Sequence, residues 1–210
     1  MRAGLLKAVR GAAVAALALA GVATAAEAQV LANLPTEPGL VPKAEARPIA
    51  AWVTFCEAYA DECAVDRNEP ARIALTPSIW TSIVTINRRI NKAVEPMTDM
   101  EHLHVADHWD LAEDGYGDCE DYQLLKRHLL ALAGLPRRAM RMTVVIDEKG
   151  EGHAVLTLLT DRGDLVLDNK TDTVLPWHRT GYVFIKRESQ DAVAWVSLGG
   201  ATSPATTANR

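Results

Sequence analysis

The sequence predicts an α+β domain in which helices come first and pack on an antiparallel sheet formed later in the chain. Three observations indicate this class: a long amphipathic stretch, a second helical pattern that starts near a lone cysteine, and a series of apolar runs divided by turn signals. Strands joined by short turns pair antiparallel, so helices followed by such a series form two layers around one core.

The first helix is predicted to begin at Pro77 and to extend for roughly 17 residues. Its apolar stripe recurs every three or four positions, at Ile79, Ile83, Ile86, Ile90 and Val94. Arg88, Arg89 and Lys92 fall elsewhere on its surface. Thr76 is suited to cap the first turn, and proline is favoured at the first helical position because the N–H that it lacks would have no partner there.

The second helix is predicted over residues 119–132. Gly115 and Gly117 interrupt the segment before it, and the Gly-Leu-Pro sequence at 134–136 ends the pattern. The apolar positions between these limits have helical spacing. They are Tyr122, Leu125, Leu129 and Leu132. The helix therefore begins at or near Cys119.

Strand-like runs follow the second helix. Three are predicted at 139–147, 153–159 and 165–168, with turn signals at 148–150 and 161–164. A last pair, at 182–186 and 192–198, extends the same sheet. The runs are mainly apolar and the turn segments contain glycine, as expected for strands joined by short turns.

The N-terminal segment has the features of a cleaved secretory signal, so we expect export to the periplasm. Residues 1–28 carry three basic residues, then a small-residue apolar run, then Ala-x-Ala cleavage options. The run is short for a membrane span, which needs about 20 residues, so an uncleaved anchor is the weaker alternative. Cleavage after Ala28 removes the three basic residues and Glu27, which takes the formal net charge from −5 to −7. Such an acidic protein is a poor candidate for nucleic-acid binding.

The remainder is the size of one domain. Residues 29–48 are rich in Pro, Ala and Glu and have little periodicity, so we expect a flexible segment there. Residues 198–210 are mainly small and polar, which predicts a disordered tail. The segment 49–197 contains no internal repeat and no linker, so it is expected to fold as a single domain.

The three cysteines fall into a pair and a single thiol. Cys56 and Cys63 are seven residues apart, a spacing that a disulfide closes if the segment turns between them. An oxidising compartment favours that pairing over two buried free thiols. Cys119 is then unpaired, and an unpaired cysteine in an exported protein is a buried passenger, a dimer link or a reactive group.

Cys119 lies in an unusual sequence, Gly-Asp-Cys-Glu-Asp-Tyr at residues 117–122. A helix N-terminus favours a thiolate through its macrodipole and its backbone N–H groups. The neighbouring Asp118, Glu120 and Asp121 oppose a second anion. A bound cation or a partnered histidine would resolve this conflict, so the motif suggests both.

His153 is the best placed of the six histidines to act as a base for this thiol. It opens an apolar strand after a glycine-containing turn, and Asp168 closes the next strand with the same parity. A Cys, His and Asp set of this kind supports nucleophilic catalysis. A tight hairpin centred on residues 162–163, however, pairs His153 with Asp172. The residues alone therefore leave two orienting acids open, Asp168 and Asp172.

Several segments together resemble the bacterial transglutaminase-like cysteine peptidases, a family that includes the LapG-type periplasmic proteases. The matching pieces are the Cys56 to Cys63 segment, Ile86-Asn87 with Ile90-Asn91, Asp107-His-Trp109, Gly117-Asp-Cys-Glu-Asp-Tyr122 with Lys126, Leu130 and Gly134, His153-Ala-Val-Leu156, and Leu167-Asp-Asn169. The resemblance implies a papain/transglutaminase-like core. It also implies Cys119 as nucleophile, His153 as general base and acid, and Asp168 as orienting carboxylate. This preference for Asp168 predicts that the simple hairpin register is wrong.

The same resemblance implies calcium as a cofactor, held beside the nucleophile at the positions of Asp118 and Glu120. Calcium prefers several oxygen ligands, of which two acids supply a part. The alternative is that these acids cap the helix start, where negative charge is favourable in any case. Asp121 is interpreted as a helix-start acid or a buried hydrogen-bonding acid.

The implied activity is that of a periplasmic cysteine protease that cleaves an exported or surface-attached protein through a thioester. A surface adhesin is the implied kind of substrate, an inner-membrane receptor is the implied regulator, and we expect a monomer. Two alternatives remain open. One is a transamidase, which passes the acyl group to an amine instead of water. The other is a non-catalytic binding module, against which the complete set of Cys119, His153 and Asp168 argues.

Two further features have weaker interpretations. The His102-Leu-His104 sequence followed by Asp107-His108 is similar to a zinc motif of metallo-hydrolases but has one residue too many, so a solvated polar loop is preferred. Trp109 is a candidate to line the cleft, with a core aromatic as the favoured alternative. The backbone N–H of Cys119 is a candidate oxyanion donor.

Overall fold

The structure, a computed structural model, describes residue 36 and residues 38–200. The predicted signal segment, residues 1–28, lies outside the described residues, as does most of the predicted tail. Within the part of the chain that is described, no helix is both long and apolar enough to cross a membrane.

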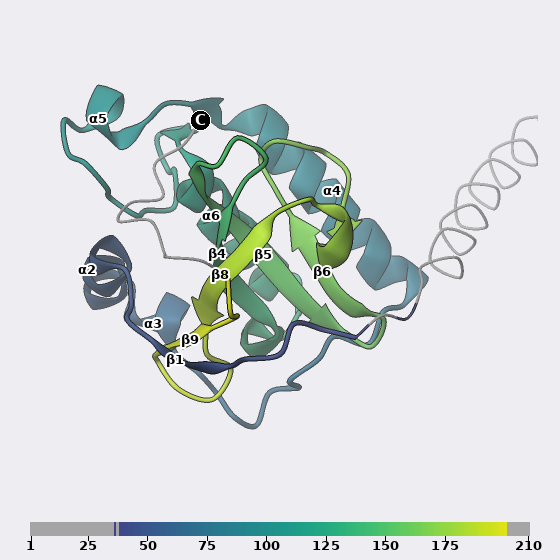
Figure 1. Cartoon of the computed structure of the whole chain (residues 1–210). Coiled ribbons are helices and arrows are strands. Elements are labelled where there is room, and N and C mark those ends of the chain that lie inside the picture. The colour runs from purple at the N-terminus through teal and green to yellow at the C-terminus, as the bar shows by residue number, and fades with distance from the viewer. Residues whose placement is uncertain (1–35, 37, 201–210) are drawn as a thin grey trace, which may run out of the picture.

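Helices α2 to α6 precede the main strands β4 to β9, as predicted, although one short strand of the sheet, β1, comes before them (Figure 1). The helices are α2 (Ala50–Ala58), α3 (Ala60–Cys63), α4 (Pro77–Ala93), α5 (Asp99–His102) and α6 (Cys119–Leu132), with 3-10 turns at Arg137–Ala139 and Trp177–Arg179. The strands are β1 (Ala44–Ala46), β2 (Glu95–Pro96), β3 (Tyr116–Gly117), β4 (Met140–Ile146), β5 (Gly152–Thr160), β6 (Gly163–Leu167), β7 (Leu175–Pro176), β8 (Val183–Glu188) and β9 (Trp195–Ser197). Apart from the short parallel pair β2 and β3, they form one antiparallel sheet of seven strands in the order β1-β9-β8-β4-β5-β6-β7.

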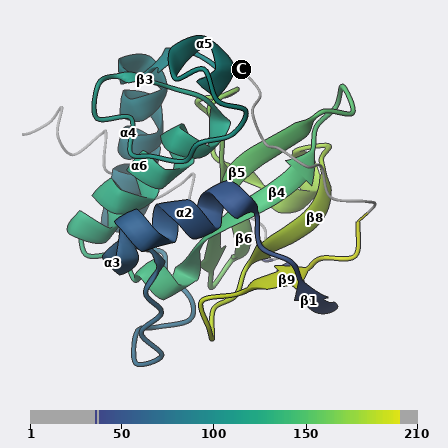
Figure 2. The same cartoon turned by 90° about the vertical axis from the view of Figure 1, so that its left-hand side faces the viewer.

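The domain has two layers, with α2, α4 and α6 on one face of the sheet (Figure 2). The main core lies between the layers and includes Trp52, Phe55, Trp80, Ile83, Leu124, Leu130, Met140, Met142, Leu156 and Leu158. The opposite face of the sheet carries a smaller cluster, Val145, Val155, Val166, Phe184 and Leu198. Val155 and Leu156 are neighbours in β5 yet belong to different clusters, because successive strand residues point to opposite faces. The predicted α+β class is confirmed.

The first predicted helix is confirmed as α4. Thr76 precedes it, and its Oγ1 accepts a hydrogen bond from the backbone N–H of Ile79 at 3.2 Å. Pro77 is the first helical residue, and Ile83 and Ile90 of the predicted stripe are buried. Asn87 is buried with them, which the apolar pattern did not indicate.

The second predicted helix is confirmed as α6, and it begins at Cys119 itself. A capping box satisfies its first turn, because Asp118 accepts from the Asp121 backbone and Asp121 Oδ2 accepts from the Asp118 N–H at 3.1 Å. Asp121 Oδ1 also accepts from the N–H of Asp110 at 2.9 Å. The interpretation of Asp121 as a helix-start, hydrogen-bonding acid therefore agrees with its contacts.

The hairpin of β5 and β6 differs from the simple one. Thr160 pairs with Gly163, and Leu156 pairs with Leu167. The partner of each β5 residue in β6 therefore lies two positions earlier in the sequence than it would in a hairpin centred on residues 162–163. As a result, Asp168 lies at the end of β6, one residue beyond the pair of Leu156 and Leu167.

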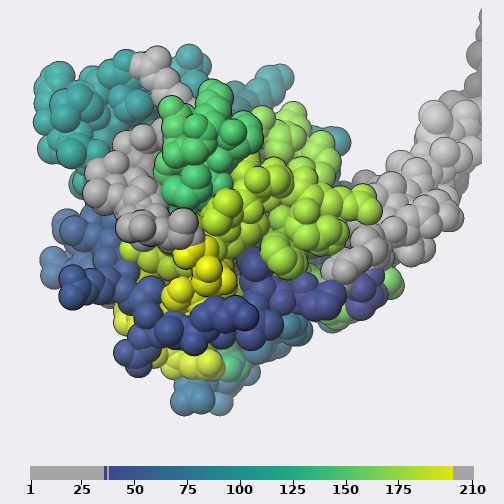
Figure 3. Space-filling view, viewed as in Figure 1, coloured from purple at the N-terminus to yellow at the C-terminus, as the bar shows by residue number. Residues whose placement is uncertain are grey.

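The described part of the segment expected to be flexible lies along the sheet. β1 pairs with β9, and the N–H of Lys43 donates to the carbonyl of Ser197 at 2.8 Å. Figure 3 shows this purple-to-blue segment running across the surface beside the yellow C-terminal strands. Leu198 is also buried, although the predicted tail starts there. Composition did not indicate either contact, because pairing at a sheet edge depends on the distant partner strand.

Cys56 and Cys63 form the predicted disulfide, which joins α2 to α3. Cys119, the other cysteine of the described residues, is not part of a disulfide. Glu62, next to the disulfide, forms an ion pair with the Nδ1 of His128 at 2.7 Å and another with Arg137.

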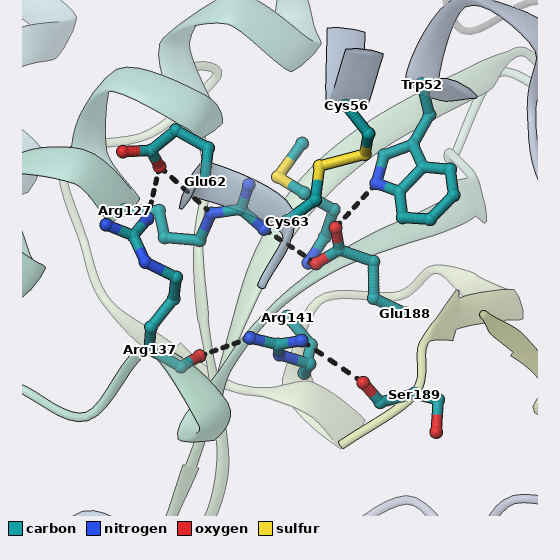
Figure 4. Close-up of a disulfide and its surroundings, with 10 residues drawn as sticks. Trp52, Cys56, Glu62, Cys63, Arg127, Arg137, Arg141, Glu188 and Ser189 are labelled. Atoms are coloured by element: carbon teal, nitrogen blue, oxygen red, sulfur yellow. Dashed lines mark hydrogen bonds and ion pairs between the residues drawn. A yellow bond between two sulfur atoms is a disulfide. The ribbon is translucent and has the colours of Figure 1, made fainter. Parts of the chain in front are cut away.

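Buried charges continue from this point toward the sheet (Figure 4). Arg127 of α6 lies 3.9 Å from Glu62 and donates to Glu188 of β8 at 2.7 Å. The other oxygen of Glu188 accepts from Trp52 Nε1 at 2.6 Å. Since Arg127 and Glu188 are both buried, their pairing fixes α6 against the sheet.

Candidate active site

Cys119 is held where the helix layer meets β5. It is the first residue of α6 and is fully buried. The backbone N–H of Ala154, in β5, donates to its Sγ at 3.3 Å. The thiol itself donates to Glu120 Oε2 at 3.0 Å. The sulfur therefore contacts the residue that directly follows His153.

His153 and Asp168 come together at the ends of β5 and β6. Nε2 of His153 lies 2.8 Å from Asp168 Oδ1, and both residues are buried. The N–H of Lys170 donates to the same oxygen at 3.0 Å, and the hydroxyl of Tyr182 donates to Oδ2 at 2.7 Å. The alternative acid, Asp172, contacts Asn91 instead, at 3.1 Å. The structure thus pairs His153 with Asp168, as the resemblance implied.

The charge of Asp168 determines which ring nitrogen of His153 carries the proton. Burial raises the pKa of Asp168, but the interactions with His153, Lys170 and Tyr182 outweigh burial and bring the pKa to about 2. An ionised Asp168 accepts the Nε2 proton of neutral His153, which leaves the lone pair on Nδ1. Nδ1 is buried, and no described residue forms a hydrogen bond with it. It is therefore the ring nitrogen available for proton transfer.

The thiol lies in an unfavourable environment for an anion. Burial raises the pKa of Cys119 well above its usual value, and the charges of Glu120 and Asp118 raise it further. The hydrogen bond from Ala154 acts in the opposite direction. Burial and the neighbouring acids thus oppose the effect of the helix N-terminus.

A cluster of carboxylates surrounds the thiol. Ligand atoms of Asp99, Asp107 and Glu120 lie within 4.8 Å of one another, and those of Asp118, Cys119 and Glu120 do the same. Burial raises the pKa of Asp118 to about 7, and the charges of Asp99 and Asp107 also raise it. The pKa of Glu120 is raised well above its usual range by burial, with Asp118 as the next cause. So many acids in one buried place need protons or a cation to offset their repulsion.

Two oxygens in this cluster lack partners. Asp118 Oδ1 and Glu120 Oε1 are buried and accept no hydrogen bond from any described residue. Carboxylate oxygens in such numbers are the ligands that calcium prefers. The residues present therefore fit a divalent cation of this kind.

The histidines of the zinc-like motif point to separate partners. His102 Nε2 pairs with Asp114 at 2.9 Å, and His104 Nδ1 lies 3.3 Å from the carbonyl of Met100. His108 Nε2 lies 4.0 Å from Asp110. None of them belongs to a potential metal-binding group among the described residues. A polar loop is the better description of this motif.

Trp109 is a core aromatic. It is 2% exposed and packs edge-on against Trp195, with ring centroids 6.3 Å apart. Its Nε1 donates to Asp107 Oδ1 at 3.1 Å. That N–H is therefore committed to the carboxylate cluster, and the favoured interpretation from the sequence agrees with the structure.

Sequence reasoning assigned no role in this site to four residues that contact it: Asp99, Asp107, Tyr182 and Asn91. Asp99 lies in the short helix α5, where a Thr-x-x-Glu capping box was the available signal. Tyr182 and Asn91 reach Asp168 from distant segments, and Asn91 Nδ2 donates to its backbone carbonyl at 3.0 Å. No local pattern marks Tyr182. Asn91, in contrast, belongs to one of the segments that carry the family resemblance.

Solved structures share this fold. Calcium-bound LapG from Legionella pneumophila matches with a TM-score of 0.50 and 21% identity, over 61% of this chain and 74% of that chain. Another structure of that protein matches at 0.49 and 21%, over 60% and 70%, and an EGTA-treated one at 0.46 and 23%, over 52% and 62%. No curated protein sequence matches the chain. At this identity the likeness establishes the fold alone.

Fold and sequence together define a cysteine peptidase of the transglutaminase-like type. The chain belongs to the family of bacterial transglutaminase-like cysteine proteinases, whose family model matches residues 42–203. This match contains the disulfide, both long helices and the strands that carry His153 and Asp168. The family suggested by the sequence motifs is confirmed.

Proposed function

We propose that the protein is a periplasmic protease that cleaves an exported or surface-attached protein, with Cys119 as nucleophile, His153 as base and acid, and Asp168 as orienting carboxylate. The observation that carries this proposal is the 2.8 Å contact between His153 Nε2 and Asp168 Oδ1. Because Nε2 faces Asp168, Nδ1 of His153 is left to act as the base. His153 is adjacent to Ala154, whose backbone N–H donates to the Cys119 sulfur.

The reaction is acyl transfer. His153 Nδ1 removes the thiol proton, and the sulfur forms a bond to the carbonyl carbon of the scissile peptide. The resulting adduct expels the amine, which takes the proton from His153, and a thioester remains. Water, deprotonated by His153, then attacks the thioester; the carboxylic acid leaves and the proton returns to the sulfur.

The developing oxyanion needs hydrogen-bond donors at the start of α6. The first N–H groups of a helix have no acceptor within the helix. We assign the backbone N–H of Cys119 to this role, since it belongs to the attacking residue and lies at the positive end of the helix dipole. Asp168 keeps the imidazole oriented through both steps.

We assign Asp118 and Glu120, together with Asp99 and Asp107, as ligands for a calcium ion. The two buried oxygens without partners and the raised pKa of Asp118 support this assignment. LapG, which shares the fold, has been solved in a calcium-bound form. When bound, calcium would supply positive charge that offsets the acids around the thiol.

A cell-surface adhesin is the substrate class that we propose, with an inner-membrane receptor as regulator of a monomeric enzyme. Export rests on the signal-like residues 1–28 and on the disulfide, because disulfides persist in oxidising compartments.

The test is a comparison of protein N-termini in a bacterial envelope extract treated with wild-type protein or with Cys119→Ala, with calcium or with EGTA. The proposal predicts new N-termini with the wild-type protein and calcium, and none with Cys119→Ala. Crosslinked peptides without new N-termini would show a transamidase instead. An extract that wild-type protein leaves unchanged would support the non-catalytic module.

A further inference from the structure

Tyr182 touches both the acid and the base of the proposed triad. Its hydroxyl donates to Asp168 Oδ2 at 2.7 Å. Its ring meets the His153 ring edge to face, with centroids 5.8 Å apart and an interplanar angle of 82°. No sequence pattern indicated a role for this residue, and the acyl-transfer steps above do not use it.

Both oxygens of Asp168 are consequently occupied. Oδ1 lies against His153 and the N–H of Lys170, while Oδ2 accepts from Tyr182. A carboxylate held on one oxygen alone can turn about its Cβ–Cγ bond. The second anchor fixes the plane of the group, so Oδ1 keeps facing Nε2. Hydrogen bonds to an ionised carboxylate are stronger than those between neutral groups, which suits them to this task.

The chain brings Tyr182 to this place from a separate part of the sheet. Tyr182 immediately precedes β8, which β4 separates from β5. The turn before it contains Gly181 at φ +78°, a conformation that residues with a side chain rarely adopt. Thr180 Oγ1 accepts the N–H of Tyr182 at 3.2 Å. The turn thus sets the direction of the side chain.

Tyr182 also lines two hollows in the structure. With Leu40, Trp177 and Phe184 it lines a groove of about 350 Å³ on the helix-free face of the sheet. With Asp168 it lines a second, smaller cavity of about 30 Å³. Tyr182 therefore borders both spaces, so removing its side chain would open the carboxylate further to water.

We propose that Tyr182 is a positioning residue for the triad, holding the Asp168 carboxylate so that His153 keeps its proton on Nε2. The proposal rests on the proposed function, in which Nδ1 of His153 is the base. Only the Nε2–H tautomer leaves a lone pair on Nδ1. A carboxylate free to turn would let the other tautomer form, and that tautomer cannot accept the thiol proton.

The direct test is ¹⁵N NMR of the His153 ring in a Cys119→Ala background, which removes the thiol from the measurement. The two ring ¹⁵N shifts report which nitrogen carries the proton. With Tyr182 intact we expect the Nε2–H form alone. Tyr182→Phe keeps the ring and loses the hydroxyl, and it should shift the tautomer ratio toward Nδ1–H by about tenfold. An unchanged ratio in Tyr182→Phe would overturn the proposal.

Tyr122→Phe is the matched control. The Tyr122 hydroxyl also donates one buried hydrogen bond, to the carbonyl of Val94 at 2.6 Å, but it does not touch Asp168. It should therefore cost similar stability and leave the His153 tautomer unchanged. A tautomer shift of equal size in both variants would mean that general loosening causes the effect, which contradicts a specific role for Tyr182.

A second measurement distinguishes failure of the Tyr182 proposal from failure of the proposed triad. The rate at which iodoacetamide alkylates Cys119 is measured by mass spectrometry in calcium-containing buffer. Tyr182→Phe should lower the rate about tenfold, and Tyr182→Ala should lower it further because water then reaches the pair. Wild-type reactivity no greater than that of His153→Ala would refute the proposed triad. Equal rates for wild type and Tyr182→Phe, with His153→Ala slower, would refute only the role of Tyr182.

Discussion

The thiol of Cys119 donates a hydrogen bond to the carboxylate of Glu120, its neighbour in α6, at 3.0 Å. The proposed nucleophile therefore lies between β5, the strand that carries its proposed base, and an acid that disfavours its anion. A Cys-His-Asp triad alone does not need such an acid. Because of this contact, the reactivity of the thiol depends on the protons or the cation that neutralise the carboxylate cluster.

Calcium should stabilise the protein through this cluster. We expect the melting temperature to rise with added calcium chloride, because a ligand that binds the folded state stabilises it by mass action. Asp118→Asn and Glu120→Gln should reduce the rise, since each removes a charged ligand. Asp61→Asn changes an exposed acid outside the cluster and should retain the full rise. Differential scanning fluorimetry measures all four proteins; no rise in the wild type would exclude the assigned site.

Buried Lys126 should make stability depend on pH. Burial lowers its pKa to about 7, with Asp168 and Asp172 opposing the change, whereas an unfolded lysine titrates near 10.4. Between these values the unfolded chain binds more protons, so the free energy of unfolding rises with pH from about 7 to 10. Lys126→Met should remove a pH-dependent difference of a few kcal/mol, at about 1.4 kcal/mol per pKa unit.

Urea unfolding at pH 6.5 and pH 10 measures this difference for Lys126. Lys92→Met replaces an exposed lysine of α4 and is the control, because both states of the protein leave that amine in water. The burial argument fails if the Lys126 and Lys92 variants show the same pH dependence.

The disulfide should stabilise the fold without taking part in catalysis. Replacing Cys56 and Cys63 together by serine should lower the free energy of unfolding by about 2–3 kcal/mol, as loop closure over this short span predicts. Alkylation of Cys119 in the folded variant should proceed at the wild-type rate. Denaturation in urea and peptide mapping under non-reducing conditions check both statements; a peptide linked through Cys119 would contradict the pairing.

Asn91 should anchor the loop that carries Asp168. Its Nδ2 donates to the carbonyls of Asp168 and Thr171, each at 3.0 Å. Asn91→Ala should lower stability by about 1–3 kcal/mol, because the carbonyls of a partly buried loop lose their donor. It should also slow the alkylation of Cys119, since Asp168 is held less firmly. Asn68→Ala, in an exposed turn, should change neither quantity.

Elements with strong local signals were predictable from the sequence. The cap at Thr76 and the apolar stripe after it define α4, and glycines on both sides define α6. α2 was missed because its apolar residues show no clear face and no side chain caps its first residue. β1 was missed for another reason: its partner strand, β9, lies more than 140 residues further along the chain.

The site was predictable only in part. Cys119 and His153 have local signals, a helix start and a strand start, and the family resemblance selected Asp168 over Asp172. The observed register then accounts for that choice, because the turn at Asp161 places Asp168 at the end of β6. Tyr182 comes from a segment whose proximity depends on the whole fold, so no local pattern could reveal it. The capping box of α5 marks a helix start at Asp99 but does not place that helix beside Cys119.

The activation of Cys119 by His153 is the central claim, and one comparison tests it most directly. The rate of Cys119 alkylation by iodoacetamide at pH 7 is measured with calcium in wild-type protein and in His153→Ala. We predict a wild-type rate at least tenfold higher, because a positioned base typically contributes about 10² or more to such chemistry. Equal rates in the two folded proteins would contradict the account.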